Sequence, residues 1–171
     1  MDTVIDASQM DPTLADQIAA EPGGEHIRRC FACGTCTASC PVREVTEHYN
    51  PRRIIRMAVL GLREQVLSSD FIWLCSTCYS CYERCPQDVR ITELMHAIKN
   101  VAVREGYIHP SFRMQVDLLR HHGRLYDLTE FENERRAEQG LPAITEQAAD
   151  FGKVFVATGL DELIQPEGEG A

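Results

Sequence analysis

Hydrophobic residues recur at helical spacing along most of this chain, and they predict a protein built from α-helices. The clearest stripe follows Asn50 and Pro51, which suit the cap and the first position of a helix. Its apolar positions are Ile54, Ile55, Ala58, Val59 and Leu62, and the opposite side carries Arg52, Arg53, Arg56 and Arg63. We expect Gly61 to weaken or end this helix. The arginine side is either a solvated face or a docking surface for an acidic partner.

Helix signals also occur before and after this stripe. A short helix is expected after Asp11-Pro12-Thr13, and another over residues 71–74 with its cap at residues 68–70. Later helices are predicted from Thr92, as the cap, to Gly106, and over residues 110–122, 130–139 and 145–158. Within the last segment Val154-Phe155-Val156 would suit a strand, but the spacing of the apolar residues favours a helix.

The two ends of the chain lack such patterns. Residues 1–10 show no periodicity and are predicted to form a mobile tail. Residues 161–171 are acidic and rich in glycine, so we expect them to be disordered or to be held only by a partner.

Composition narrows the class of protein. The chain has 171 residues, about the length of one domain with extensions. Its formal net charge of −9 argues against nucleic acid as a partner. No apolar run approaches the roughly 18 residues of a membrane span, so we expect no direct membrane insertion. The acidic N-terminus has no apolar signal core, which predicts a cytoplasmic protein.

Two cysteine runs repeat one pattern, C-x2-C-x2-C-x3-C-P. They are Cys30-Phe-Ala-Cys33-Gly-Thr-Cys36-Thr-Ala-Ser-Cys40-Pro41 and Cys75-Ser-Thr-Cys78-Tyr-Ser-Cys81-Tyr-Glu-Arg-Cys85-Pro86. Each cysteine of the second run lies 45 positions after its counterpart, and the runs contain all 8 cysteines of the chain. Scattered cysteines would rarely keep this register, so the repeat indicates a pair of metal sites.

Bacterial two-cluster ferredoxins use this spacing, and there the fourth cysteine of each run ligates the other cluster. The predicted ligands are Cys30, Cys33, Cys36 and Cys85 for a first [4Fe–4S] cluster, and Cys75, Cys78, Cys81 and Cys40 for a second. Zinc is a weaker alternative because it usually takes well-separated cysteine pairs. A disulfide framework is weaker too, because it needs an oxidising compartment.

The remaining conspicuous residues suggest no catalysis. Trp73 is interpreted as part of the core or as a shield for a cluster. Tyr79 and Tyr82 would exclude water from the cluster that their own cysteine run binds. Arg28 and Arg29 are either solvated or offset cluster charge. No nucleophile–base pair, glycine-rich phosphate loop or pair of catalytic carboxylates is recognisable, so we predict no catalytic residue in this chain.

Two such runs joined by a helical linker resemble the α-helical ferredoxin domain. The closer resemblance is to the small iron–sulfur subunit, the C subunit, of heterodisulfide reductase. The segments that carry it are Cys30-Phe-Ala-Cys33-Gly-Thr-Cys36, Asn50-Pro51-Arg52, Trp73-Leu74-Cys75-Ser-Thr-Cys78, Asp88 to Ile98, and Glu132-Asn133-Glu134-Arg135. The fold expected from this resemblance is an all-α ferredoxin core that binds two [4Fe–4S] clusters, with flanking helices that dock partners.

The resemblance also implies a function and partners. In that family a flavin-containing subunit passes electrons to the small subunit, which hands them to a partner with CCG domains that cleaves a disulfide. This chain has no CCG motif, so the disulfide chemistry is expected in another chain. The alternative is a free-standing two-cluster carrier that serves another oxidoreductase, and the helices after residue 106 argue against it.

We therefore expect four segments in the chain. Residues 1–24 would form a tail and a short helix, and residues 25–106 the ferredoxin domain with both cluster sites. Residues 107–160 would form a helical extension that docks a partner, and residues 161–171 the acidic tail.

Overall fold

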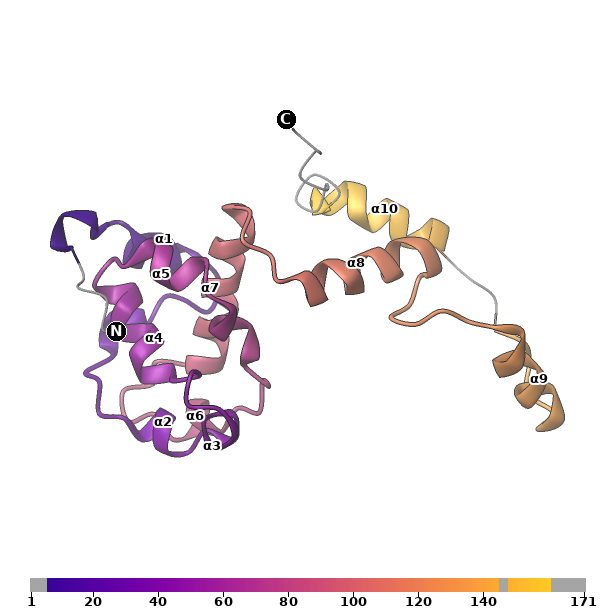
Figure 1. The fold of residues 1–171 in the computed structure, drawn as a ribbon, viewed down its shortest axis with the longest axis horizontal. Coiled ribbons are helices and arrows are strands. Elements are labelled where there is room, and N and C mark those ends of the chain that lie inside the picture. Colours follow the sequence, from indigo (N-terminus) through magenta and orange to yellow (C-terminus); the bar gives the residue numbers. More distant parts are fainter. Residues whose placement is uncertain (1–5, 145–147, 161–171) are drawn as a thin grey trace. The chain divides into compact units, whose positions relative to one another are not determined.

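The computed structural model describes residues 6–144 and 148–160 (Figure 1). The predicted acidic tail, and the first residues of the helix predicted over 145–158, lie outside these ranges. Every regular element of the described residues is helical, which confirms the predicted all-α class. None of these helices is both long and apolar enough to cross a lipid bilayer. The chain divides into two compact units, Met1–Tyr107 and Ile108–Ala171.

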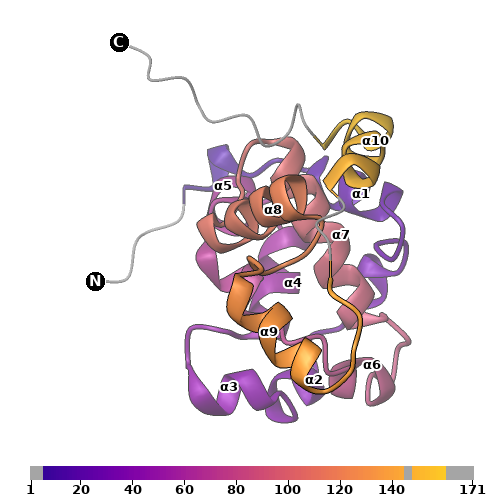
Figure 2. The ribbon, with the colours of Figure 1, turned by 90° about the vertical axis from the view of Figure 1, so that its right-hand side faces the viewer.

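The first unit contains the cysteine runs. Its α-helices are α1 (Leu14–Ala20), α2 (Thr35–Ala38), α3 (Pro41–Val45), α4 (Pro51–Val59), α5 (Arg63–Leu67), α6 (Ser80–Glu83) and α7 (Ile91–Arg104), and its 3₁₀-helices are η1 (Ala7–Gln9), η2 (Ile27–Arg29) and η3 (Asp70–Leu74). Figures 1 and 2 show α1 and α5 at one end of this unit and the short helices α2, α3 and α6 at the other, with α4 and α7 between them. The long helices therefore form a scaffold for the short ones.

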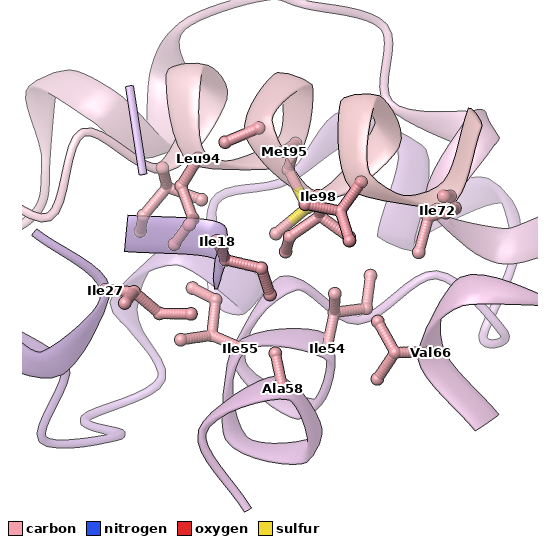
Figure 3. Close-up of a cluster of buried hydrophobic side chains, with 14 of the residues drawn as sticks. Ile18, Ile27, Ile54, Ile55, Ala58, Val66, Ile72, Leu94, Met95 and Ile98 are labelled. Atoms are coloured by element: carbon pink, nitrogen blue, oxygen red, sulfur yellow. The ribbon is translucent and has the colours of Figure 1, made fainter. Parts of the chain in front are cut away.

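The scaffold is held by an apolar core between α4 and α7. Ile54 and Ile55 on α4 face Met95 and Ile98 on α7, and Ile18 of α1 lies beside them (Figure 3). Each of these side chains is at most 1% exposed. Because burial of one such side chain contributes about 1.5–3 kcal/mol, these residues stabilise the helices that carry the cysteine loops.

The predicted helix after Asn50-Pro51 is confirmed but ends earlier than its apolar stripe. Gly61 adopts a left-handed φ of 77°, and its carbonyl accepts a 2.7 Å hydrogen bond from the N–H of Asp11. Leu62, which we placed on this helix, is buried just before α5 instead. Arg63 was expected beside the other arginines, but it belongs to α5 and its Nε lies 2.7 Å from Asp11 Oδ2. Arg63 also pairs with Glu105, so its side chain links α5 to residues near both ends of this unit's sequence rather than facing solvent.

The start of α7 also differs from the prediction. Arg90, at a left-handed φ of 55°, is the cap residue, and Thr92 lies inside the first turn. Thr92 is 1% exposed, and its Oγ1 lies 3.6 Å from Cys81 Sγ. Its hydroxyl therefore contacts a predicted cluster ligand instead of capping the helix.

Parts of the first unit carried no clear sequence signal. The predicted mobile tail includes one 3₁₀ turn, η1, whose cap Asp6 accepts a 2.9 Å hydrogen bond from the N–H of Ser8. Helices α2, α3, α5 and α6 span four or five residues each, which is too short for a periodic stripe.

The second unit consists of α8 (Pro110–His122), α9 (Glu130–Glu138) and α10 (Ala148–Thr158). These helices confirm the three predicted segments, including the one that contained a strand-like run. Gly123 ends α8 with a left-handed φ of 68°, and the N–H of Thr129 donates a 2.9 Å hydrogen bond to Glu132 Oε2 at the start of α9. Within this unit α10 packs on α8 and buries Phe155.

Candidate metal centres

One hollow of the first unit brings together four thiols from both cysteine runs. Cys30, Cys33 and Cys36 line it from the first run, and Cys85 lines it from the second. Arg52 of α4 lines it as well. These are the four thiols that the crossed assignment gives to the first cluster. The hollow supports that assignment, which stays a prediction.

The other four thiols also lie near one another. Burial raises the pKa of the Cys81 thiol, and the nearby charges of Cys75, Cys78 and Cys40 raise it further. Burial likewise raises the pKa of Cys36 to about 11, with smaller contributions from Cys30 and Cys81. Since Cys36 and Cys81 belong to different predicted clusters, the two sets adjoin.

The two exposed thiols face small hydroxyl side chains at equivalent repeat positions. Thr35 Oγ1 lies 3.4 Å from Cys33 Sγ, and hydrogen bonds from Thr35 lower the pKa of Cys33. Ser80 Oγ lies 3.6 Å from Cys78 Sγ, and hydrogen bonds from Ser80 lower the pKa of Cys78. Each run therefore offers one thiolate stabilised by its own loop.

The backbone of the two loops repeats as well. Ala32 and Gly34 have φ of 60° and 92° in the first loop, and their counterparts Thr77 and Tyr79 have φ of 57° and 61° in the second. Left-handed residues in such loops form concavities of N–H groups that bind anions. Left-handed φ at a residue other than glycine costs of order 1–3 kcal/mol and occurs mostly at functional sites.

The thiols fit a cluster better than a single ion. In the part of the chain that the structure describes, no three His, Cys, Asp or Glu side chains are close enough to share one metal ion. A cubane takes one thiolate at each of its irons, so its ligands surround a volume and need not converge on one point. The buried thiols need a nearby positive charge to remain thiolates, and bound iron supplies it.

Polar contacts hold the segment that directly precedes the first cysteine run. Arg29 lies 3.5 Å from Asp88, a residue that follows the second run, and His26 Nδ1 contacts the Asp88 carbonyl at 3.0 Å. Arg28 pairs with Asp16 at 2.6 Å. Both arginines therefore have partners within the chain, and the Asp88 contacts provide a second link between the two runs.

The sequence analysis did not identify three residues that lie near the thiols. Two of them lie near Cys75 of the second set, and the third lines the hollow of the first set. Tyr49 is 2% exposed and its phenol lies beside Cys75, and burial, followed by the interaction with Cys75, raises its pKa. Lys99 lies near Cys75 and 5.7 Å from the centre of the half-buried Trp73 ring. Arg52 was predicted to lie on a face of α4 away from the core, without a link to the cluster. None of the three has a spacing signal, because each is distant in sequence from the thiols that it approaches.

Comparison with known families agrees with this geometry. The 4Fe-4S dicluster domain family matches residues 26–89, which contain both cysteine runs. The site therefore holds two [4Fe–4S] clusters, as predicted.

Relatives match far beyond the cysteines. The C subunit of the H(2):CoB-CoM heterodisulfide,ferredoxin reductase of Methanothermobacter thermautotrophicus is 34% identical over 170 residues, which covers 95% of this chain and 91% of the relative. The C subunit of a Ferredoxin:CoB-CoM heterodisulfide reductase of Methanosarcina mazei is 42% identical over 128 residues, covering 75% and 78%. That of a Ferredoxin/F(420)H(2)-dependent CoB-CoM heterodisulfide reductase of Methanosarcina acetivorans is 41% identical over 137 residues, covering 80% and 83%. Because the similarity includes the helices on both sides of the dicluster domain, the chain belongs to the family of small iron–sulfur C subunits of heterodisulfide reductases.

Proposed function

We propose that this chain is the electron-transfer subunit of a heterodisulfide reductase-like complex. It relays single electrons through its two clusters from a flavin-containing subunit to a CCG-domain subunit, where a disulfide is reduced. The names of the relatives give the CoB–CoM heterodisulfide as the substrate of their complexes. For the complex of this chain we propose only the class of acceptor, a disulfide.

The observation that carries this proposal is the interlocking of the two runs. Cys85 reaches the hollow of the first run, and Cys36 lies within electrostatic range of Cys81. If the ligands cross in this way, neither cluster can move without the other, and the distance between them is constant. A constant short distance is what sequential electron transfer between two centres requires.

In this proposal the side chains of the chain bind the clusters and tune their potentials, and none of them takes part in breaking a substrate bond. Each [4Fe–4S] cluster, when bound, supplies a centre that accepts and releases one electron. The hydroxyls of Thr35, Ser80 and Thr92 and the phenol of Tyr49 lie against thiols, where hydrogen bonds to sulfur tune the potential.

The second unit supports membership of a larger complex. Several of its apolar side chains are solvent-exposed, including Met114 at 66%, Phe131 at 59% and Val156 at 74%. A carrier that diffuses freely would have no use for these side chains, whereas a docked subunit would bury them.

Two measurements on protein purified without oxygen test the proposal. The first is iron and acid-labile sulfide, and about eight of each per chain are expected for two cubanes. The second is size-exclusion chromatography of the material captured through a tag on this chain, with assay of flavin and disulfide reduction. Two reducible clusters in a chain that elutes alone would favour the free-standing carrier. Zinc in place of iron would overturn electron transfer altogether.

A further inference from the structure

The start of α4 carries positive charge where a helix favours negative charge. Arg52 and Arg53 lie in its first turn, which contains no acidic residue, and Arg56 follows one turn later. The positive end of the helix dipole disfavours cations there. All three side chains are exposed.

Five of the seven other arginines of the same unit form ion pairs with described residues of the chain, and the two exceptions are Arg43 and Arg84. The pairs are Arg28–Asp16, Arg29–Asp88, Arg63–Asp11, Arg90–Glu93 and Arg104–Glu21. Among the described residues, none of the three α4 arginines makes an ion pair. A cluster of uncompensated arginines in a chain of net charge −9 therefore needs a reason other than folding.

The position of these arginines supplies that reason. They line a hollow with Ala32, Asn50 and Met57, and we call this hollow the arginine groove. Ala32 and Arg52 also line the hollow that contains the first set of thiols, so the two hollows adjoin. Beside them Cys33 is exposed and Phe31 is 61% exposed.

We propose that the arginine groove is the docking surface for an acidic face of the partner subunit that exchanges electrons with the first cluster. This inference rests on the proposed function. A strongly acidic chain repels an acidic partner over most of its surface, so a local basic groove directs the partner to this edge. Arginine suits the purpose because its planar guanidinium binds carboxylates with two parallel hydrogen bonds. The exposed Phe31 and Cys33 then lie at the edge of the contact, next to the first cluster.

Compensation of the cluster charge is the competing explanation, and the geometry separates the two. Arg52 lines both hollows and is placed to offset cluster charge, whereas Arg53 and Arg56 line the arginine groove and not the thiol hollow. Substitutions at positions 53 and 56 should therefore affect docking without changing the cluster.

Carbodiimide cross-linking tests the partner directly, because this reagent joins amines to carboxylates in contact and does not react with arginine. The chain contains two lysines, Lys99 and Lys153, so the background is small. In the complex purified without oxygen, Arg53→Lys/Arg56→Lys should give links from these positions to Asp or Glu of another subunit, identified by mass spectrometry. The control Arg28→Lys/Arg29→Lys should link within the chain, to Asp16 and Asp88.

Charge reversal provides a second measurement. Arg53→Glu/Arg56→Glu should weaken binding of the partner subunits by roughly tenfold or more at low salt, with a smaller difference at high salt. The control Arg43→Glu, at an arginine of the same unit that lines neither hollow, should bind nearly as the unchanged protein does. Iron content and the electron paramagnetic resonance spectrum should be the same in both variants.

The outcomes distinguish this inference from the proposed function. An intact complex in which positions 53 and 56 give no link to another subunit would overturn the docking surface alone. A chain that carries both clusters but elutes without any other subunit would overturn the proposed function and the docking surface with it. An altered cluster spectrum in the Arg53→Glu/Arg56→Glu variant would show that these arginines serve the cluster, and it would also overturn the inference.

Discussion

The hydroxyl of Thr37 donates a 2.9 Å hydrogen bond to Asn50 Oδ1, and this contact joins the first cysteine run to the start of α4. The same Asn50 oxygen accepts the N–H of Arg53 at 3.0 Å, so it also caps the helix. The N–H of Arg52 in turn donates to Thr37 Oγ1 at 3.1 Å. The position of the first cluster loop therefore depends on one helix cap.

Asn50→Ala should consequently destabilise both the helix and the first cluster. The loss of an N-cap typically costs about 1 kcal/mol, and here the Thr37 contact is lost as well. Denaturant unfolding of the iron-loaded protein measures the first effect, and the rate of iron release to a chelator measures the second. Asn50→Asp keeps the oxygen acceptor and is the control. Equal behaviour of the two variants would contradict this role for the cap.

The crossed ligand assignment predicts a specific pattern of iron loss. Cys85→Ala should remove the cluster bound by Cys30, Cys33 and Cys36, because Cys85 lines their hollow. Adding Cys33→Ala should cause little further loss, since both residues serve one cluster, whereas adding Cys78→Ala should remove nearly all iron. Iron per chain distinguishes these cases. If the Cys85→Ala/Cys78→Ala variant retains half of the iron, each run binds its own cluster and the assignment is wrong.

The glycine at the end of α4 predicts a backbone effect. A Cβ at Gly61 would clash with the carbonyl oxygen of Asp11, and φ is 77° there. Gly61→Ala should therefore lower the free energy of unfolding by more than about 1 kcal/mol. Gly106 is the matched control, because its φ is 85° but a Cβ would meet no atom within 4 Å. Similar destabilisation by Gly61→Ala and Gly106→Ala in denaturant titrations would mean that the clash with Asp11 is unimportant.

Sequence reasoning succeeded where one local pattern was sufficient. The stripe of α4 and that of α7 predicted both helices because each buries one face in the same apolar core. Helix ends were less predictable, because contacts between distant segments decided them. Asp11 hydrogen-bonds to the Gly61 carbonyl and pairs with Arg63, and no sequence pattern near residue 60 indicates these two contacts.

The candidate sites show the same division. The repeated ferredoxin-type spacing predicted two [4Fe–4S] clusters, which the dicluster family match confirms, and the crossed thiol sets stay a prediction. The spacing could not predict the residues outside the two loops that approach the thiols, since these residues do not follow the repeat. Tyr49, whose phenol interacts with Cys75, has Leu94 as its counterpart one repeat later, and leucine has no group that can donate a hydrogen bond to sulfur. The two clusters therefore have different environments despite identical ligand spacing.

That difference predicts unequal potentials, and Tyr49 provides the test. Its buried phenol lies beside Cys75, and a hydrogen bond from a phenol to a cluster sulfur favours the more negative, reduced form of the cluster. Tyr49→Phe should thus shift the second cluster to a more negative potential by on the order of tens of millivolts, where 59 mV is a tenfold change for one electron. A redox titration followed by electron paramagnetic resonance resolves the two clusters, and the first should keep its potential. Tyr107→Phe, at a partly exposed tyrosine away from both thiol sets, is the control. An unchanged potential in Tyr49→Phe would mean that the phenol only fills space beside Cys75, and the asymmetry would then have to come from Lys99 or Arg52.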